Sequence, residues 1–140
     1  MKKSLIGLAL AVIAVLAVAC AQDAGTDTGK VIKSSSAGNN LTVALSNSNG
    51  AFKNGDNHFF LTFKDSSGKT VDVGAVALVF QMPAMGTMPA MNNAATFTTT
   101  GTIGVYQGNV KLESAGDWQA AVSYEGAAGK GKTSLSITAQ

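Results

Sequence analysis

From Leu41 onward the chain alternates apolar and polar residues in short segments that are separated by turn residues. Alternation with a period of two places every second side chain on one face of a β-strand. Several such strands between turns are typical of an antiparallel β-sandwich. The pattern therefore predicts an all-β domain of about seven or eight strands, without a helix in the mature chain. The clearest inward-facing sets are Leu41, Val43 and Leu45; Phe59, Leu61 and Phe63; Val76, Leu78 and Phe80; Trp118, Ala120, Val122 and Tyr124; and Leu135 and Ile137.

Turn-forming and small polar residues set the expected boundaries. Residues 65–68 read Asp-Ser-Ser-Gly and predict a hairpin into a strand over Thr70–Val73, and Gly126–Lys132 is expected to be a loop. Residues 20–39 are rich in small and polar side chains, which bury too little apolar surface to offset the entropy lost on ordering. We expect a flexible tether over 20–39, with an edge strand over Val31–Ser35 as a candidate addition, and one folded domain over 40–140.

The first nineteen residues have the layout of an export signal. Lys2 and Lys3 precede an uncharged apolar run over Leu5–Ala19, which is shorter than the roughly 20 residues a membrane-spanning helix needs. Residues 17–20 read Ala-Val-Ala-Cys and resemble a lipobox, the site where a bacterial lipoprotein is lipidated on cysteine, although alanine stands where leucine is usual. Cleavage by the ordinary signal peptidase is the alternative, because small residues also satisfy its rule.

Cys20 favours lipidation because it is the only cysteine, and an unpaired thiol is unusual in an exported protein. Residues 1–19 would then be a lipoprotein signal peptide, and acyl chains on Cys20 would tether the mature protein to a membrane. Ala21 is not the aspartate that retains some lipoproteins at the inner membrane. The expected location is the periplasmic face of an outer membrane or the cell surface.

The mature chain has no net side-chain charge. The ten lysines of the full sequence include Lys2 and Lys3, so eight remain against eight acidic residues. Nucleic-acid binding requires a basic surface, and no such excess is present. A nucleic-acid partner is therefore not expected.

Residues 82–91 read Met-Pro-Ala-Met-Gly-Thr-Met-Pro-Ala-Met and contain both prolines and every methionine except the initiator. A three-residue interval alternates between the faces of a strand, and a proline within the segment opposes a helix. Polyproline II has three residues per turn and would align four side chains along one edge. A turn at Gly86 would bring the two Met-Pro-Ala-Met arms side by side. The four aligned residues are Met82, Met85, Met88 and Met91.

Thioether sulfur is a soft, uncharged ligand that favours Cu(I) or Ag(I) over Zn²⁺, Mg²⁺ or Ca²⁺. The four methionines therefore predict a site for Cu(I). The alternative is that these flexible apolar side chains form a docking surface for a membrane protein partner, without metal. His58, the only histidine, is a further candidate ligand if folding brings it beside the methionines, and is otherwise a solvent-facing residue at a strand entry.

Several motifs together resemble the YtkA-like domain. They are Asp65–Lys69, the strand through Phe80, the Met-Pro-Ala-Met-Gly of residues 82–86, and Tyr106, Gly108, Val110, Leu112, Gly116 and Trp118. The resemblance covers about Leu41–Tyr124 and implies a small exported bacterial protein with an immunoglobulin-like sandwich. Such domains often occur beside copper or heavy-metal transport and respiratory-oxidase assembly functions, which implies a copper transporter or an oxidase assembly factor as partner.

Carried over by position, the family motif implicates Met82 and Met85. Histidine often follows the glycine of that motif, whereas Thr87 stands there in this chain and a second Met-Pro-Ala-Met follows. The loss of an imidazole weakens a Cu(II) site, and the additional sulfurs strengthen a Cu(I) site.

No motif for catalysis is present in the sequence. There is no cysteine nucleophile in the folded domain, no phosphate-binding loop in a strand-to-helix setting, and no carboxylate pair marked by its context. We therefore expect a protein that is not an enzyme.

Overall fold

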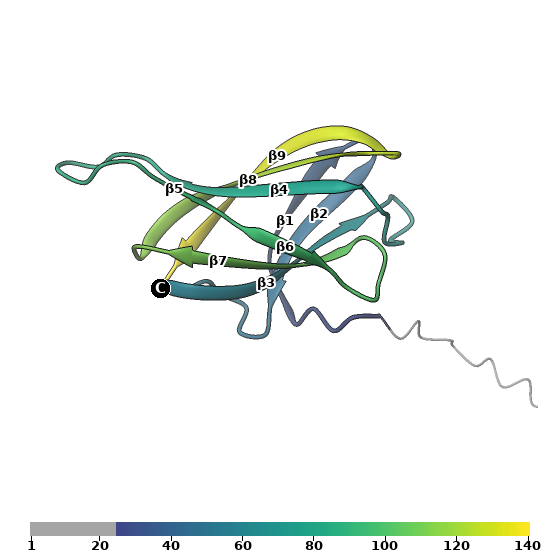
Figure 1. The fold of residues 1–140 in the computed structure, drawn as a ribbon, viewed down its shortest axis with the longest axis horizontal. Helices are drawn as coiled ribbons and strands as arrows, with labels where there is room; N and C mark the ends of the chain where they lie inside the picture. The colour runs from purple at the N-terminus through teal and green to yellow at the C-terminus, as the bar shows by residue number, and fades with distance from the viewer. Residues whose placement is uncertain (1–24) are drawn as a thin grey trace, which may run out of the picture.

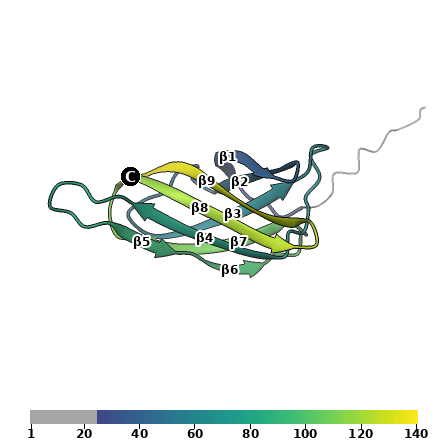
Figure 2. The same ribbon diagram turned by 90° about the horizontal axis from the view of Figure 1, so that it is seen from above.

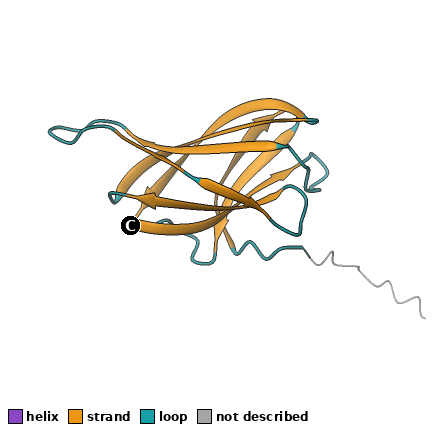
Figure 3. Cartoon of the chain, viewed as in Figure 1, coloured by secondary structure: helices purple, strands orange, loops and turns teal. Residues whose placement is uncertain are grey.

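The computed structural model of the protein describes residues 25–140, which form nine β-strands and contain no helix within that range. Figure 1 shows the arrangement of the strands, and Figure 3 separates them from the connecting loops. The strands are β1 Lys30–Gly38, β2 Leu41–Asn47, β3 Gly55–Lys64, β4 Ala75–Met82, β5 Met91–Ala94, β6 Thr96–Thr99, β7 Val105–Leu112, β8 Gly116–Gly126 and β9 Gly129–Ala139.

The strands form two sheets with the orders β1-β2-β3-β7-β6 and β5-β4-β8-β9. All pairings between these strands are antiparallel, and an isolated parallel bridge joins Phe52 to Ala139. The two layers can be followed in Figure 2. The prediction of an all-β, antiparallel sandwich is confirmed.

The core lies between the two sheets and includes the inward sets that the alternation predicted, with Val76 only partly buried. Leu45, Phe63, Phe80 and Leu135 are each at most 1% exposed. Most of their neighbours along the strands face solvent or are partly covered, whereas Ser46 and Thr62 are also buried. Because residues two apart share a face, one face of each strand supplies the core. The continuous apolar interior stabilises the sandwich by removing these side chains from water.

The first sheet begins earlier than the tether boundary at residue 39 predicts. Strand β1 pairs with β2 from Lys30 opposite Asn47 to Gly38 opposite Leu41, and its polar side chains mostly face solvent. An edge strand is held mainly by its backbone hydrogen bonds, so a low apolar content does not prevent it from forming. The candidate edge strand over Val31–Ser35 is therefore confirmed, and it is part of a nine-residue strand within the residues predicted to be a tether.

Two further boundaries differ from the sequence prediction. Thr70 makes only an isolated bridge with Lys64, so Thr70–Val73 is not a strand. Most of the predicted Gly126–Lys132 loop belongs to β8 and β9, where Gly126 pairs with Gly129. Glycine is needed within β9 because a Cβ on Gly131 would lie 2.7 Å from the Tyr124 hydroxyl and from the Ala37 carbonyl oxygen. In this segment, glycine is needed for close packing between strands as well as for a turn.

The N-terminal segment of the described residues contacts the loop between β6 and β7. The backbone N–H of Thr26 donates a hydrogen bond of 2.9 Å to Oγ1 of Thr102 in that loop. Among residues 25–140 there is no helix long and apolar enough to cross a bilayer. The predicted signal peptide of residues 1–19 and the predicted lipidation site Cys20 lie outside the described residues.

Candidate functional site: the methionine hairpin

Strands β4 and β5 and the segment between them form one long hairpin that projects beyond the end of the sandwich (Figure 1 and Figure 2). The strands pair from Val79 opposite Ala94 to Met82 opposite Met91. The same register continues to an isolated bridge between Met85 and Met88. The four methionines are therefore two directly opposed cross-strand pairs.

Gly86 and Thr87 form the two-residue turn at the tip of this hairpin. The N–H of Met85 donates to the carbonyl of Met88 at 3.1 Å, and the N–H of Met88 donates to the carbonyl of Met85 at 2.9 Å. Gly86 has a φ of +58°, whereas Thr87 does not have a positive φ. A positive φ at the first central residue alone is typical of a type II′ turn, which favours glycine there. The predicted turn at Gly86, with the two arms side by side, is confirmed.

The two pairs of methionines differ sharply in burial. Met82 is 2% exposed within the core, and Met91 is partly buried against it, whereas Met85 is 53% and Met88 44% exposed. Directly opposed residues share a face of a hairpin, and a three-residue step changes the face. The register thus places the pair Met85 and Met88 on the face opposite to the pair Met82 and Met91.

This arrangement corrects the prediction that a polyproline II segment lines up all four sulfurs on one edge. The two arms keep the register of β4 and β5 as far as the bridge between Met85 and Met88, so a three-residue interval separates the methionines in the way that a strand requires. Pro83 and Pro89 interrupt the hydrogen bonding only locally, since they lack an N–H, and pairing resumes at Met85 and Met88. The fold brings Met85 and Met88 together at the tip and keeps Met82 inside the sandwich.

The base of the hairpin is anchored through Met82 and its surroundings. A Cβ added to Gly116 would lie 3.2 Å from the terminal methyl carbon of Met82, so this glycine leaves room for the buried side chain. The indole N–H of Trp118, which is 1% exposed, donates to the carbonyl of Ser114 at 3.0 Å. The inward position predicted for Trp118 is confirmed, and Tyr106 is buried as well.

An aromatic cluster supports the sheet from which the hairpin extends. Phe80 of β4 lies 5.3 Å from Phe52 and 5.9 Å from Phe59, and Phe59 lies 5.8 Å from Phe97, measured between ring centroids. Such tilted and edge-to-face pairs are favourable beyond the apolar area that they bury. The cluster fixes β4 only two residues before Met82.

His58 is not brought to the methionine tip. It lies exposed on β3 of the other sheet, where Nδ1 hydrogen-bonds to the side-chain oxygen of Asn109. His58 shares a surface hollow with Ala94, which follows Met88 by six residues along the hairpin arm. At about 3.3 Å per residue in an extended strand, the six residues from Met88 to Ala94 span about 20 Å. The structure therefore does not group His58 with Met85 and Met88.

Among the described residues, no other group of metal-ligating side chains accompanies the two methionines at the tip. Within residues 25–140 there is no group of three or more His, Cys, Asp or Glu side chains that could hold a metal ion. No residue between Asp72 and Lys111 is charged, so the entire hairpin is neutral. The ligand chemistry at its tip is that of the two exposed thioethers. Sequence reasoning missed this division of the methionines, although the three-residue interval was the signal that could have revealed it.

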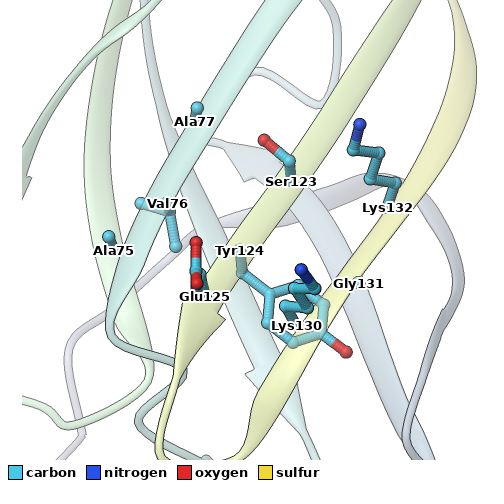
Figure 4. A pocket seen from close by; sticks show the side chains of 9 residues that line it. All are labelled: Ala75, Val76, Ala77, Ser123, Tyr124, Glu125, Lys130, Gly131 and Lys132. Atoms are coloured by element: carbon cyan, nitrogen blue, oxygen red, sulfur yellow. The ribbon is translucent and has the colours of Figure 1, made fainter.

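A surface hollow with a volume of about 600 Å³ lies elsewhere, on β4, β8 and β9 (Figure 4). Its lining includes small side chains such as Ala75, Ala77 and Ser123, and the lining residues Glu125 and Lys130 are cross-strand neighbours. The hollow contains no pairing of a nucleophile with a histidine base. It does not suggest a catalytic centre.

The two-sheet fold and the neutral projecting hairpin define a β-sandwich domain that presents a pair of thioethers. The YtkA-like family profile matches residues 35–123, more than half of the chain, and the protein belongs to the YtkA-like family. This is not a known enzyme family. No significant match was found among curated proteins or among solved structures.

Proposed function

We propose that this protein is a lipid-anchored, exported protein that binds Cu(I), or Ag(I), at the tip of its methionine hairpin for copper handling or delivery. The observation that carries the proposal is the opposed, exposed pair Met85 and Met88. Directly opposed residues in an antiparallel pair have Cβ atoms about 5 Å apart. The three rotatable bonds of each methionine allow both sulfurs to reach one ion.

The chemistry of the tip favours a soft monovalent ion. Thioethers are neutral and bind Cu(I) in preference to hard cations, which require oxygen ligands. The hairpin carries no carboxylate or imidazole that would compete for Zn²⁺ or Cu(II). Of the four methionines predicted as ligands, we assign direct binding to Met85 and Met88. Met82, together with the partly buried Met91, holds the base of the hairpin against the core.

The position of the N-terminal segment suggests how the tip is presented. Thr26 is bound to the β6–β7 loop, and Asp72 and Thr102 line one hollow at that end of the molecule. Figure 1 shows the hairpin tip at the opposite end. Ten residues separate Ala75 from Met85, which corresponds to about 33 Å of strand. An acyl anchor on Cys20, five residues before Gly25, would hold the near end within about 17 Å of the membrane and direct the tip away from it.

We propose that the anchored protein resides at the periplasmic face of an outer membrane or at the cell surface. Its partner would be a copper transporter or an oxidase assembly factor, reached by a tip that points away from the anchoring membrane. The protein itself would act without catalysis, by holding the ion or handing it on.

A second candidate function rests on the same exposure. Methionine is an adaptable apolar side chain, and the projecting neutral tip could dock into an apolar site on a membrane protein without any metal. Under this alternative the sulfur atoms contribute only shape and apolar surface. Replacing methionine by leucine should then leave the function nearly unchanged, since the volumes are similar.

A competition titration separates the two functions. The processed chain with Cys20→Ser is titrated with Cu(I) under anaerobic, reducing conditions against a chromogenic Cu(I) chelator. We expect M85L/M88L to lose Cu(I) uptake and M82L to retain it. Uptake that survives in M85L/M88L, or no uptake by the unmodified tip, would contradict the proposal. Folding of each variant is checked by the fluorescence of the buried Trp118.

A further inference from the structure

The metal site proposed at the hairpin tip is incomplete within one chain. Met85 and Met88 supply two neutral thioethers, and two such ligands leave a Cu(I) ion open to further coordination. Met82 is in the core, and Met91 shares its face of the hairpin, away from the exposed pair. His58 lies on the other sheet, hydrogen-bonded to Asn109. No additional soft or imidazole ligand of the described residues therefore stands beside the exposed pair.

The surface around the tip suits a close approach by a second molecule. The tip extends beyond both sheets, so another chain can reach it without contact between the two sandwiches (Figure 1 and Figure 2). Every residue between Asp72 and Lys111 is uncharged, so two such hairpins do not repel each other electrostatically. Pro83 and Pro89 lack backbone donors, which disfavours association of the arms by strand pairing. Two hairpins are therefore expected to meet through the side chains on the face that carries Met85 and Met88.

We propose that a second copy of this chain completes the site, with two hairpin tips meeting face to face around one Cu(I) or Ag(I) ion. The inference rests on the function proposed above and adds a partner to it. Met85 and Met88 of the two copies would together supply four thioethers. This is the number of methionine ligands that the sequence predicts for a single chain. A twofold contact of this kind is self-complementary, because each copy contributes the same two residues.

The dimer would be linked by the metal ion. The apolar area at the tip is small, consisting mainly of two exposed methionines and the flanking prolines and alanines, and stable protein dimers bury far larger surfaces. The chain is therefore expected to be monomeric without metal. Excess metal should also return it to monomers, since each tip then takes an ion of its own.

Sedimentation velocity combined with metal analysis tests this proposal. The processed chain with Cys20→Ser is titrated with Ag(I), which binds thioethers and is stable in air, and the result is repeated with Cu(I) under reducing conditions. The expected result is a doubling of the mass near one ion per two chains. Metal-free protein and protein with a large excess of Ag(I) should sediment as monomers.

Two variants provide the matched comparison. M85L/M88L should remain monomeric at every ratio, and M82L should dimerise as the parent does. A parent chain that binds one ion and stays monomeric would overturn the shared site and leave the proposed copper binding intact. A chain that binds no ion would overturn both. Dimers that form without metal, or in M85L/M88L, would show that the link is not made by these sulfurs.

Discussion

Met85 and Met88 exchange a pair of backbone hydrogen bonds, of 3.1 and 2.9 Å, across the two residues that turn the hairpin. This relationship makes the two residues directly opposed, so their side chains leave the same face. The same register places Met82 opposite Met91 on the other face, where Met82 is buried. One repeated sequence motif thus supplies a structural residue at the base and an exposed thioether at the tip.

The two kinds of methionine should differ strongly in their contribution to stability. Met82→Ala removes a fully buried side chain and should lower the free energy of unfolding by about 2–5 kcal/mol. Met85→Ala changes an exposed side chain and should alter it by less than about 0.5 kcal/mol. Chemical denaturation of both variants measures the difference. Equal destabilisation by the two substitutions would contradict the assignment of Met82 to the core.

Gly86→Ala should loosen the tip without affecting the sandwich. The positive φ of Gly86 strains any residue with a Cβ by about 1–2 kcal/mol, which corresponds to a factor of about 5–30 in local opening. Hydrogen exchange of the Met85 and Met88 amides should accelerate accordingly. Gly101→Ala is the matched control, because Gly101 has no positive φ and a Cβ there meets open space. Unchanged exchange in Gly86→Ala would argue against the type II′ turn.

Gly108→Ala should disturb the aromatic cluster beneath the hairpin. A Cβ on Gly108 would lie 2.4 Å from Cζ of Phe59, which packs against Phe52, Phe80 and Phe97. Overpacking of this kind typically costs about 1–3 kcal/mol. The denaturation midpoint should fall relative to that of Gly101→Ala. A midpoint equal to the control would mean that the ring of Phe59 has room to move.

Tyr106 should make the stability fall at alkaline pH. Burial raises the pKa of the Tyr106 phenol, and its O–H lies within hydrogen-bonding distance of Asp72 Oδ1 at 3.2 Å and of the Gly74 carbonyl at 3.1 Å. The folded state then favours the neutral phenol. This contribution is complete below the unfolded pKa of about 10 and is lost as the pH rises through the folded value.

Denaturation between pH 8 and pH 11 measures this loss, and Tyr106→Phe provides the control. The variant should lose this component of the alkaline decline and should be less stable than the parent at neutral pH by about 1 kcal/mol, because one hydrogen bond is missing. An identical alkaline decline in the parent and in Tyr106→Phe would exclude Tyr106 as its source.

The inward faces of the main strands could be predicted because, over most of each strand, the buried positions alternate with exposed or partly covered ones. Alternation at Phe59, Leu61 and Phe63 is therefore visible in the sequence and agrees with their burial. The turn at Gly86 was equally accessible, because glycine between two similar arms permits a tight reversal. These features depend on local chemistry that a single segment carries.

Features that depend on pairing could not be read in the same way. The candidate edge strand over Val31–Ser35 falls short of the full β1, which has few apolar residues. The strand is stabilised by β2 and by the Tyr124 hydroxyl, which donates to the carbonyl of Ala37 at 2.8 Å. The requirement for glycine at 131 likewise arises from Tyr124, which is close in space because β8 and β9 pair. Such contacts join residues that are far apart in the sequence, or that meet only because their strands pair.

The methionines show how a correct local rule led to a wrong conclusion. The three-residue interval does alternate between the faces of a strand, and on that ground the sequence predicts polyproline II instead of a strand. The hairpin instead uses the alternation, since Met82 faces the core while Met85 and Met88 face solvent. Pro83 and Pro89 are accommodated because the projecting arms have no outer neighbours that need their N–H groups.

The central claim is that soft-metal binding belongs to Met85 and Met88 and not to the buried Met82. The most direct measurement is an NMR titration of the processed chain, labelled with ¹³C at the methionine methyl groups, with Ag(I). The methyl signals of Met85 and Met88 should shift together, and the signal of Met82 should stay in place. A shift of Met82 equal to theirs, or no shift of any methionine signal, would contradict this claim.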